Sequence, residues 1–299
     1  MITRLTADIA ELRIDRFLHG QLPDRSRSYI QKLIEQGLVR QNGQPVRAST
    51  KTLLHATIEI EFPEPAPSHL VPESIPLDIR YEDEWLLVIN KPQGMVVHPA
   101  VGHREGTLVH ALLAYCGDSL SDINGVIRPG IVHRIDKDTS GLLMVVKDNR
   151  VHADIAEKIR RHEVTRVYQA VVHGVMPSSA GTIDAPIGRD PKNRQRMAVV
   201  AGGKPAVSHF TVLEQFHQAA HLEVRLESGR THQIRVHLQF VGHPVVGDPL
   251  YAPGRKTFGL SGQALHASSL TFEHPVTGES ITVESPLPPA FTQLLEQLR

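Results

Sequence analysis

The segment GIVHRIDKDTSGLLM, residues 130–144, concentrates reactive side chains more than any other stretch of the chain. Seven polar residues lie between two apolar flanks: His133, Arg134, Asp136, Lys137, Asp138, Thr139 and Ser140. The apolar run over residues 142–146 predicts a strand, and a polar loop held by a strand is a common place for a functional site. A plain turn is the alternative, and for Asp138 we prefer that structural interpretation because aspartate often satisfies backbone groups in turns.

The chain around this segment mixes strand and helix patterns. Besides residues 142–146, strands are predicted over residues 85–89, 168–172 and 222–226. Helices are predicted over residues 107–115, 154–161, 231–241 and 291–298. Because strands and helices do not alternate regularly, a doubly wound parallel sheet is not expected, and the sequence predicts the α+β class.

A small basic module is expected over residues 1–62. Eight basic and three acidic residues lie between positions 13 and 51. A helix is predicted between Ser26, its N-cap, and Gly37, at its C-terminal end. It is followed by a turn at Asn42-Gly43 and by a strand over residues 58–62. We expect the order helix, helix, hairpin, strand. The basic side chains either contact RNA or merely face solvent.

An acidic, proline-rich linker is predicted over residues 63–75, with a large domain over residues 76–299. Residues 59–84 hold eight acidic residues, one arginine and five prolines, a composition that favours an extended chain. The whole chain has 32 Lys and Arg against 32 Asp and Glu. Taken alone, this balance argues against nucleic-acid binding, but the sum conceals the basic module and the acidic linker.

The compartment follows from what the sequence lacks. Cys116 is the single cysteine, which excludes an intrachain disulfide and suits a reducing compartment. The N-terminus has no apolar signal core, and no apolar run approaches the roughly 20 residues of a membrane span. We expect a cytoplasmic, monomeric protein that is not bound to a membrane.

Four spaced motifs resemble those of the RluA-type pseudouridine synthases. They are NKPQGMVVHP (residues 90–99), HRIDKDTSGLL (133–143), TRVYQAVVHG (165–174) and GRTHQIRVHLQFVGHPVVGDPLYA (229–252), the last with Ala252 where glycine is common. The basic module resembles an S4-type RNA-binding domain. Within the family the likeness is closest to synthases of large-subunit ribosomal RNA. It implies a small S4-like domain followed by a catalytic domain with a mixed, largely antiparallel sheet and flanking helices.

The resemblance implies the reaction and its catalytic residues. Pseudouridine forms when the N1–C1′ bond of a uridine breaks and C5 joins C1′, which requires no cofactor. The resemblance gives Asp136 the role of catalytic carboxylate and places Arg235 beside it, where a guanidinium favours the ionised form. The resemblance leaves three alternative roles for Asp136: attack on C1′, attack on C6 or removal of the C2′ proton. The resemblance also gives Tyr168 the role of stacking on the uracil, whereas its strand alone predicts a core residue with a bonded hydroxyl.

Further residues are predicted to bind RNA or to support the site. The RNA-binding candidates are Arg134, Arg25, Arg27, Lys32, Arg194 and Arg196, with Arg194 and Arg196 in a basic loop that is otherwise a solvated turn. The supporting candidates are His133, Asn90, Lys91 and Thr139. Ribosomal RNA, free or in an assembling particle, is the expected partner.

Two other functions compete with this interpretation. A metal-dependent hydrolase would use some of the 18 histidines, but His232 and His237 are five residues apart on a predicted helix and face different directions. No H-E-x-x-H or C-x-x-C pair is present, and no metal site is predicted. The second competitor is a non-catalytic S4-domain RNA-binding protein, although all the expected polar residues are present.

Overall fold

The structure is a computed structural model. It describes residues 2–22, 25, 27–63, 70–99, 102–123, 129–193 and 196–299, with the backbone alone for Ser28 and Asp118. The predicted N-cap Ser26 and the RNA-binding candidate Arg194 lie outside the described residues.

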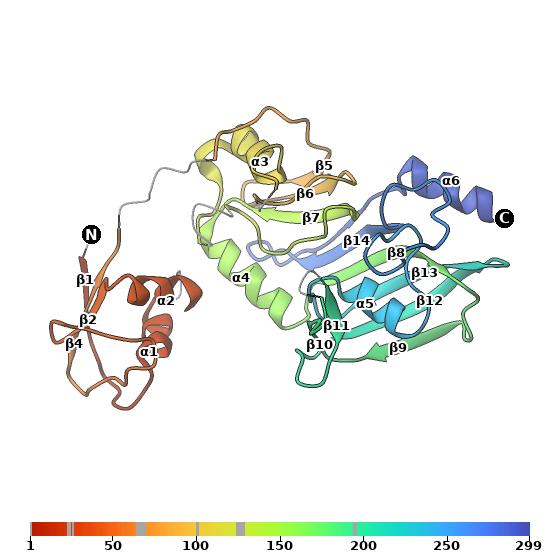
Figure 1. Cartoon of the computed structure of the whole chain (residues 1–299). Helices are drawn as coiled ribbons and strands as arrows, with labels where there is room; N and C mark the ends of the chain where they lie inside the picture. Colours follow the sequence, from red (N-terminus) through yellow and green to blue (C-terminus); the bar gives the residue numbers. More distant parts are fainter. Residues whose placement is uncertain are drawn as a thin grey trace.

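The N-terminal residues form a small unit of their own (Figure 1). Its elements are β1 (Ile2–Thr6), α1 (Ile14–Gln21), α2 (Arg27–Glu35), β2 (Val39–Gln41), β3 (Gln44–Pro45) and β4 (Thr57–Glu61). The four strands pair antiparallel in the order β1-β4-β2-β3. Ile14, Leu18, Ile30 and Leu33 of the helices pack against Ile58 of β4 in a separate apolar core.

The predicted order of this unit was incomplete, because strand β1 precedes the two helices. No residue of β1 is fully buried, and its sequence ITRLT does not show the alternation of apolar and polar residues that predicts a strand. Its residues instead owe their conformation to pairing with β4, from Ile2 opposite Glu61 to Thr6 opposite Thr57.

The large domain is built on a nine-stranded mixed sheet, as expected for the α+β class. The strand order is β5-β6-β7-β14-β8-β13-β12-β9, and β15 pairs with β14. Among the described strands, β7 and β14 are the parallel pair, and the other pairs of this sheet are antiparallel. The strands are β5 (Ile79–Glu82), β6 (Leu86–Lys91), β7 (Ser140–Val146), β8 (Thr165–His173), β9 (Ala180–Asp184), β12 (Val207–Gln215), β13 (Ala219–Leu226), β14 (Leu265–Glu273) and β15 (Ser280–Glu284). A separate hairpin joins β10 (Ile187–Arg189) to β11 (Met197–Val199).

Helices flank this sheet (Figure 1): α3 (Leu108–Cys116), followed by the short 3₁₀ helix η1 (Gly117–Ser119), α4 (Asn149–Arg160), α5 (Gln233–Phe240) and α6 (Pro289–Leu298). All four α-helices were predicted, but α4 begins five residues earlier than expected. Asp148 caps it by accepting hydrogen bonds from the N–H groups of Arg150 and Val151. The prediction started at the apolar stripe and overlooked this cap.

Strand β7 is buried on both faces, which explains its unbroken apolar sequence. Leu142 and Met144 pack on one face in a cluster that includes side chains of α4. Leu143 and Val145 pack on the other face in the main core, which includes side chains of α3. The loop that precedes β7 is therefore attached to one of the most buried strands of the domain.

The acidic stretch is only partly a linker. Glu59 and Glu61 belong to β4, and Glu82 belongs to β5. Leu70 and Leu77 pack against the main core, and the carboxylate of Glu73 accepts a hydrogen bond from the N–H of Gly106. The chain thus joins the large domain before its first strand.

Among the histidines that the structure describes, seven have a pKa lowered by burial: His133, His152, His173, His221, His232, His237 and His266. The lowering is largest for His133, to a pKa of about 3, and His152, to a pKa of about 4. Folding thus keeps these imidazoles neutral, whereas an unfolded histidine titrates near ~6.5.

We expect the free energy of unfolding to fall as the pH is lowered from 7 to 4. Below pH ~6.5 the histidines of the unfolded chain bind protons that the buried histidines of the folded chain do not bind. The free energy of unfolding is therefore highest above pH ~6.5 and falls as the pH is lowered to the pKa values of the folded protein. His152 alone accounts for roughly 3 kcal/mol between pH 6.5 and pH 4. Urea unfolding at pH 7, 6, 5 and 4 measures this, and His152→Gln should flatten the dependence. The exposed His55→Gln serves as control, and stability that is constant or rises toward acid would contradict the expectation.

Candidate active site

The polar loop in front of β7 is held by contacts on several sides. The buried ammonium group of Lys91 donates hydrogen bonds of 2.9 Å to the carbonyls of Pro92, Met95 and Lys137. Burial lowers the pKa of Lys91 to about 7, against the opposing charges of Asp138 and Asp136. Lys91 thus ties the end of β6 to the loop and is not among the residues that line the cavity described below.

Two other predicted supporting residues fix the same loop. The N–H of Thr139 donates to the carbonyl of Asp136 at 3.2 Å, and its hydroxyl accepts a hydrogen bond from Gln263. Nε2 of His133 accepts the N–H of Met144 at 3.0 Å, which places the proton of this neutral imidazole on Nδ1. Asn90, in contrast, donates to Asp78 at 2.9 Å and lies outside the cavity lining.

Gly141 allows β7 to start beside β14. Its φ is +109°, and a Cβ at this position would lie 2.3 Å from the carbonyl oxygen of Ala267. Gly141 pairs with Ala267 in the parallel ladder, so any side chain here would push the two strands apart. The glycine after Ser140 is therefore a geometric requirement of the loop.

Asp136 and Arg235 form an ion pair across the cavity. Nη1 of Arg235, on α5, donates to Oδ2 of Asp136 at 2.8 Å, although the residues are 99 positions apart. The same guanidinium donates Nε and Nη2 to Asp248, at 2.6 and 2.9 Å. Burial alone would lower the pKa of Arg235, but the hydrogen bonds and charges of Asp248 and Asp136 raise it above its ordinary value. Arg235 is therefore a permanent cation held between two carboxylates.

Asp248 is a site residue that the sequence interpretation missed. Its side chain is fully buried, and Oδ1 also accepts the backbone N–H groups of Leu250 and Tyr251. The signal was available, since Gly247-Asp248-Pro249 lies inside the fourth motif.

His232, which contacts Tyr251, makes a second contact to Asp136 that the sequence interpretation also missed. Nε2 of His232 lies 3.8 Å from Oδ1 of Asp136, and Nδ1 is 2.9 Å from the Tyr251 hydroxyl. His232 has a φ of +58° at the N-terminus of α5, and this left-handed conformation directs its ring to the cavity. His237 lies elsewhere, between the hydroxyl of Ser208 and the carbonyl of Ala185.

The basic loop predicted to touch RNA contacts this cluster. The loop joins β10 to β11, and the guanidinium of Arg196 lies 5.0 Å from the ring centroid of Tyr251. The N–H of Met197 donates to the Tyr251 hydroxyl at 3.0 Å. Arg196 is thus half-buried against the site and is not part of a freely solvated turn.

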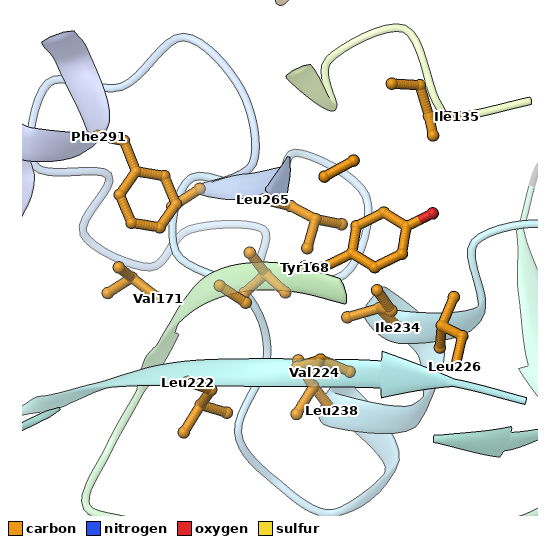
Figure 2. Packing of buried hydrophobic residues seen from close by; sticks show 14 of the residues in the cluster. Ile135, Tyr168, Val171, Leu222, Val224, Leu226, Ile234, Leu238, Leu265 and Phe291 are labelled. Atoms are coloured by element: carbon orange, nitrogen blue, oxygen red, sulfur yellow. The ribbon is translucent and has the colours of Figure 1, made fainter. Parts of the chain in front are cut away.

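Tyr168 lies on β8, between Val224 of β13 and Ala267 of β14. Figure 2 shows its ring between Leu265 and Ile234 in the main core. Burial raises the pKa of its hydroxyl, which is directed to the cavity and has no hydrogen-bond partner among the described residues. The structure therefore differs from the alternative prediction, in which the hydroxyl of a core tyrosine is hydrogen-bonded.

These side chains surround one cavity of about 350 Å³. Six predicted residues line it together: His133, Arg134, Asp136, Thr139, Tyr168 and Arg235. Arg134 is exposed at its edge. Arg166, Arg230 and His232 also line it, although none of them was predicted. Among the described lining residues Asp136 is the one carboxylate.

The other RNA-binding candidates belong to the N-terminal unit. Arg27 donates two hydrogen bonds to the buried Asp15, which also accepts from Arg13 and Gln31. Arg25 lies 5.9 Å from the ring centroid of Tyr29. Lys32 is exposed on α2. Asp15 thus orients two arginines on one surface of this unit.

No group of three side chains suited to hold a metal ion occurs among the described residues. Likewise, no helix in the described parts of the chain is long and apolar enough to cross a membrane.

Comparison with known proteins identifies the family. A family model described as RNA pseudouridylate synthase matches residues 85–240, and a model of the S4 domain matches residues 12–54. The chain belongs to the RNA pseudouridylate synthase family. It is therefore an isomerase with an S4 domain at its N-terminus. This family membership favours the synthase over the two competing functions, the metal-dependent hydrolase and the non-catalytic RNA-binding protein.

Relatives cover nearly the whole synthase. The uncharacterized RNA pseudouridine synthase YlyB of Bacillus subtilis is 53% identical over 287 residues, 96% of this chain and 94% of that protein. Ribosomal large subunit pseudouridine synthase D of Zymomonas mobilis is 44% identical over 307 residues, 98% of this chain and 96% of that protein. The predicted likeness to large-subunit synthases is confirmed.

A solved structure has the same fold. Human RNA Pseudouridylate Synthase Domain Containing 1 superposes with a TM-score of 0.58 and 25% sequence identity. The match covers 75% of this synthase and 95% of the human chain.

Proposed function

We propose that this synthase isomerises uridines of large-subunit ribosomal RNA, with Asp136 as the catalytic carboxylate. The observation that carries the proposal is the pair of Asp136 and Arg235 in the cavity, 2.8 Å apart. Relatives named ribosomal large subunit pseudouridine synthase D, at 44% identity in both Zymomonas mobilis and Pseudomonas aeruginosa, support the choice of RNA.

The arrangement suits attack on a glycosidic centre. A carboxylate reacts there as nucleophile or base only when it is ionised, and the permanent charge of Arg235 stabilises that form. Attack on C1′, attack on C6 and removal of the C2′ proton all require the same ionised Asp136. Asp248 fixes the guanidinium from the far side, so Asp136 keeps its position while charge moves on the substrate.

The cavity walls supply the other functions. A uridine must leave the RNA stack to reach a recessed carboxylate, which costs a few kcal/mol. The ring of Tyr168 offers a face on which the uracil stacks, worth about 1–3 kcal/mol. Its hydroxyl has no protein partner among the described residues and is placed to move a proton when C5 loses its hydrogen. Arg134, exposed at the edge, contacts the RNA backbone or fills the gap left by the extruded base.

Binding of the surrounding RNA falls to local basic surfaces. In the S4 domain these are Arg25, Arg27 and Lys32, and in the large domain they include Arg196. Arg194, proposed for the same role, lies outside the described residues. Phosphate contacts of this kind make affinity fall as salt rises.

The substrate is tested with purified protein and three RNAs. We expect pseudouridine to form in transcripts of large-subunit ribosomal RNA and not in small-subunit ribosomal RNA or transfer RNA, as mapped by carbodiimide modification and primer extension. Activity should be unchanged in EDTA, because no step of the reaction requires a metal. Modification of transfer RNA or small-subunit RNA alone would refute the proposed substrate while leaving the enzyme class intact.

A further inference from the structure

One buried cation in the cavity has no role in the chemistry above. Arg166, on β8, is only 6% exposed, and its side chain lies on the same face of the strand as that of Tyr168. Its buried Nε has no hydrogen-bond partner, and no ion pair involves its guanidinium in the parts of the chain that the structure describes. The guanidinium lines the cavity.

Such an arrangement costs stability. A buried guanidinium is normally paired with a carboxylate and fully hydrogen-bonded, because its desolvation is otherwise uncompensated. Asp136 is the one acid among the described lining residues, and Arg235 already pairs with it. The charge of Arg166 also acts on its neighbours, since it contributes to the lowered pKa of His133. A free cation retained at this cost suggests an anionic ligand from outside the protein.

Gly229 lies directly against the guanidinium of Arg166. A Cβ on Gly229 would lie 2.7 Å from Nη1 of Arg166, so a side chain at this position would displace the tip of the arginine side chain. Glycine at this position therefore allows the guanidinium to stay at the cavity wall, which Gly229 and Arg230 also line.

We propose that Arg166, which lies beside Gly229, binds a backbone phosphate of the RNA next to the flipped uridine. A guanidinium presents paired donors that match the oxygens of a phosphate. Arg166 and Tyr168 are two positions apart on one strand, about 6.6 Å, so the phosphate and the stacked uracil of one nucleotide are held by the same rigid element. This inference rests on the proposed function, because it takes the cavity to be the uridine site.

Arg166→Met should lower activity without lowering stability. Removing an unpaired buried charge should leave the unfolding midpoint equal to or above that of the wild type. The kcat/KM for pseudouridine formation should fall roughly ten- to hundredfold, as expected for a lost hydrogen bond to a charged group. Arg166→Lys should recover part of this loss. A variant that is destabilised or unfolded would show that Arg166 is structural and would overturn the proposal.

The phosphate itself is tested by salt dependence. Both proteins in this comparison carry Asp136→Asn, which prevents turnover of the RNA. Adding Arg166→Met should make the slope of log Kd against log salt concentration shallower by about 0.7. The probe is an RNA stem–loop that the wild-type protein pseudouridylates. One uncharged methylphosphonate linkage beside the target uridine should weaken binding to the parent and have no further effect with Arg166→Met. A phosphate contact would be excluded if the slope is unchanged. It would also be excluded if the methylphosphonate at every linkage weakens binding of Arg166→Met as much as it weakens binding of the parent.

Two controls separate this inference from the proposed function. Arg225 is an exposed arginine on β13 that pairs with Val167, so it lies on the opposite face of the sheet from Arg166. Arg225→Met should leave kcat/KM and the salt slope within twofold of the wild type. If Asp136→Asn is fully active, the proposed function fails. If Asp136→Asn is inactive but Arg166→Met retains the slope, only the phosphate site fails.

Discussion

Asp136→Asn is expected to lower pseudouridine formation by roughly four to six orders of magnitude, the loss seen when an enzyme's reacting group is removed. A carboxamide neither attacks C1′ or C6 nor takes a proton from C2′, so all three routes stop. The carboxamide oxygen can still accept the hydrogen bond from Arg235 that is now 2.8 Å long, so the cavity should keep its shape. Single-turnover assays with excess enzyme measure the chemical step without contributions from product release.

Binding and a neighbouring carboxylate supply the controls for this variant. RNA affinity and the unfolding midpoint of Asp136→Asn should stay close to those of the wild type. Asp138 lies in the same loop and, in our interpretation, has a structural role, so Asp138→Asn should cost less than about tenfold in rate. Equal losses in the two variants would mean that the loop, and not the Asp136 carboxylate, is what the reaction requires.

Asp248→Asn is expected to have the second largest effect, because it damages both the fold and the site. The Asp248 carboxylate is fully buried and accepts Nε and Nη2 of Arg235 together with two backbone N–H groups. Replacing it leaves part of a buried cation uncompensated, which costs about 3–5 kcal/mol of unfolding free energy. We also expect a loss of roughly a hundredfold in kcat, since Arg235 no longer holds Asp136 rigidly.

Urea unfolding and kinetics on the same preparation measure both effects. Glu223→Gln, an exposed carboxylate change on β13, should alter stability by less than about 0.5 kcal/mol. The rate of Asp248→Asn should stay low after correction for the folded fraction. Wild-type kcat per folded molecule would contradict the role of Asp248 in holding the ion pair.

The sequence predicted the elements whose patterns are local. Strand β13 and helices α3 and α5 appear where they were expected. Strand β1 and the hairpin of β10 and β11 were not predicted, because short strands with partly exposed faces carry little periodicity. Their conformation depends on partners far along the chain.

The residues of the site likewise fall into those that were predicted and those that were missed. The motifs predicted Asp136, Tyr168 and Arg235, and the fold brings them to one cavity although 99 residues separate the ion pair. Asp248, His232 and Arg166 lie inside the quoted motifs, but their roles were missed because those roles depend on distances in the folded protein. His232 needs a left-handed backbone to approach Asp136, and Arg166 is distinguished only by its burial without a partner.

The most direct measurement of the central claim is a map of pseudouridines in ribosomal RNA from cells that lack this protein. The cells are complemented with the wild-type gene or with Asp136→Asn, at equal protein levels. We predict that specific pseudouridines of large-subunit RNA disappear in the deletion, return with the wild type and stay absent with Asp136→Asn. Unchanged large-subunit RNA in the deletion, or full restoration by Asp136→Asn, would contradict the account.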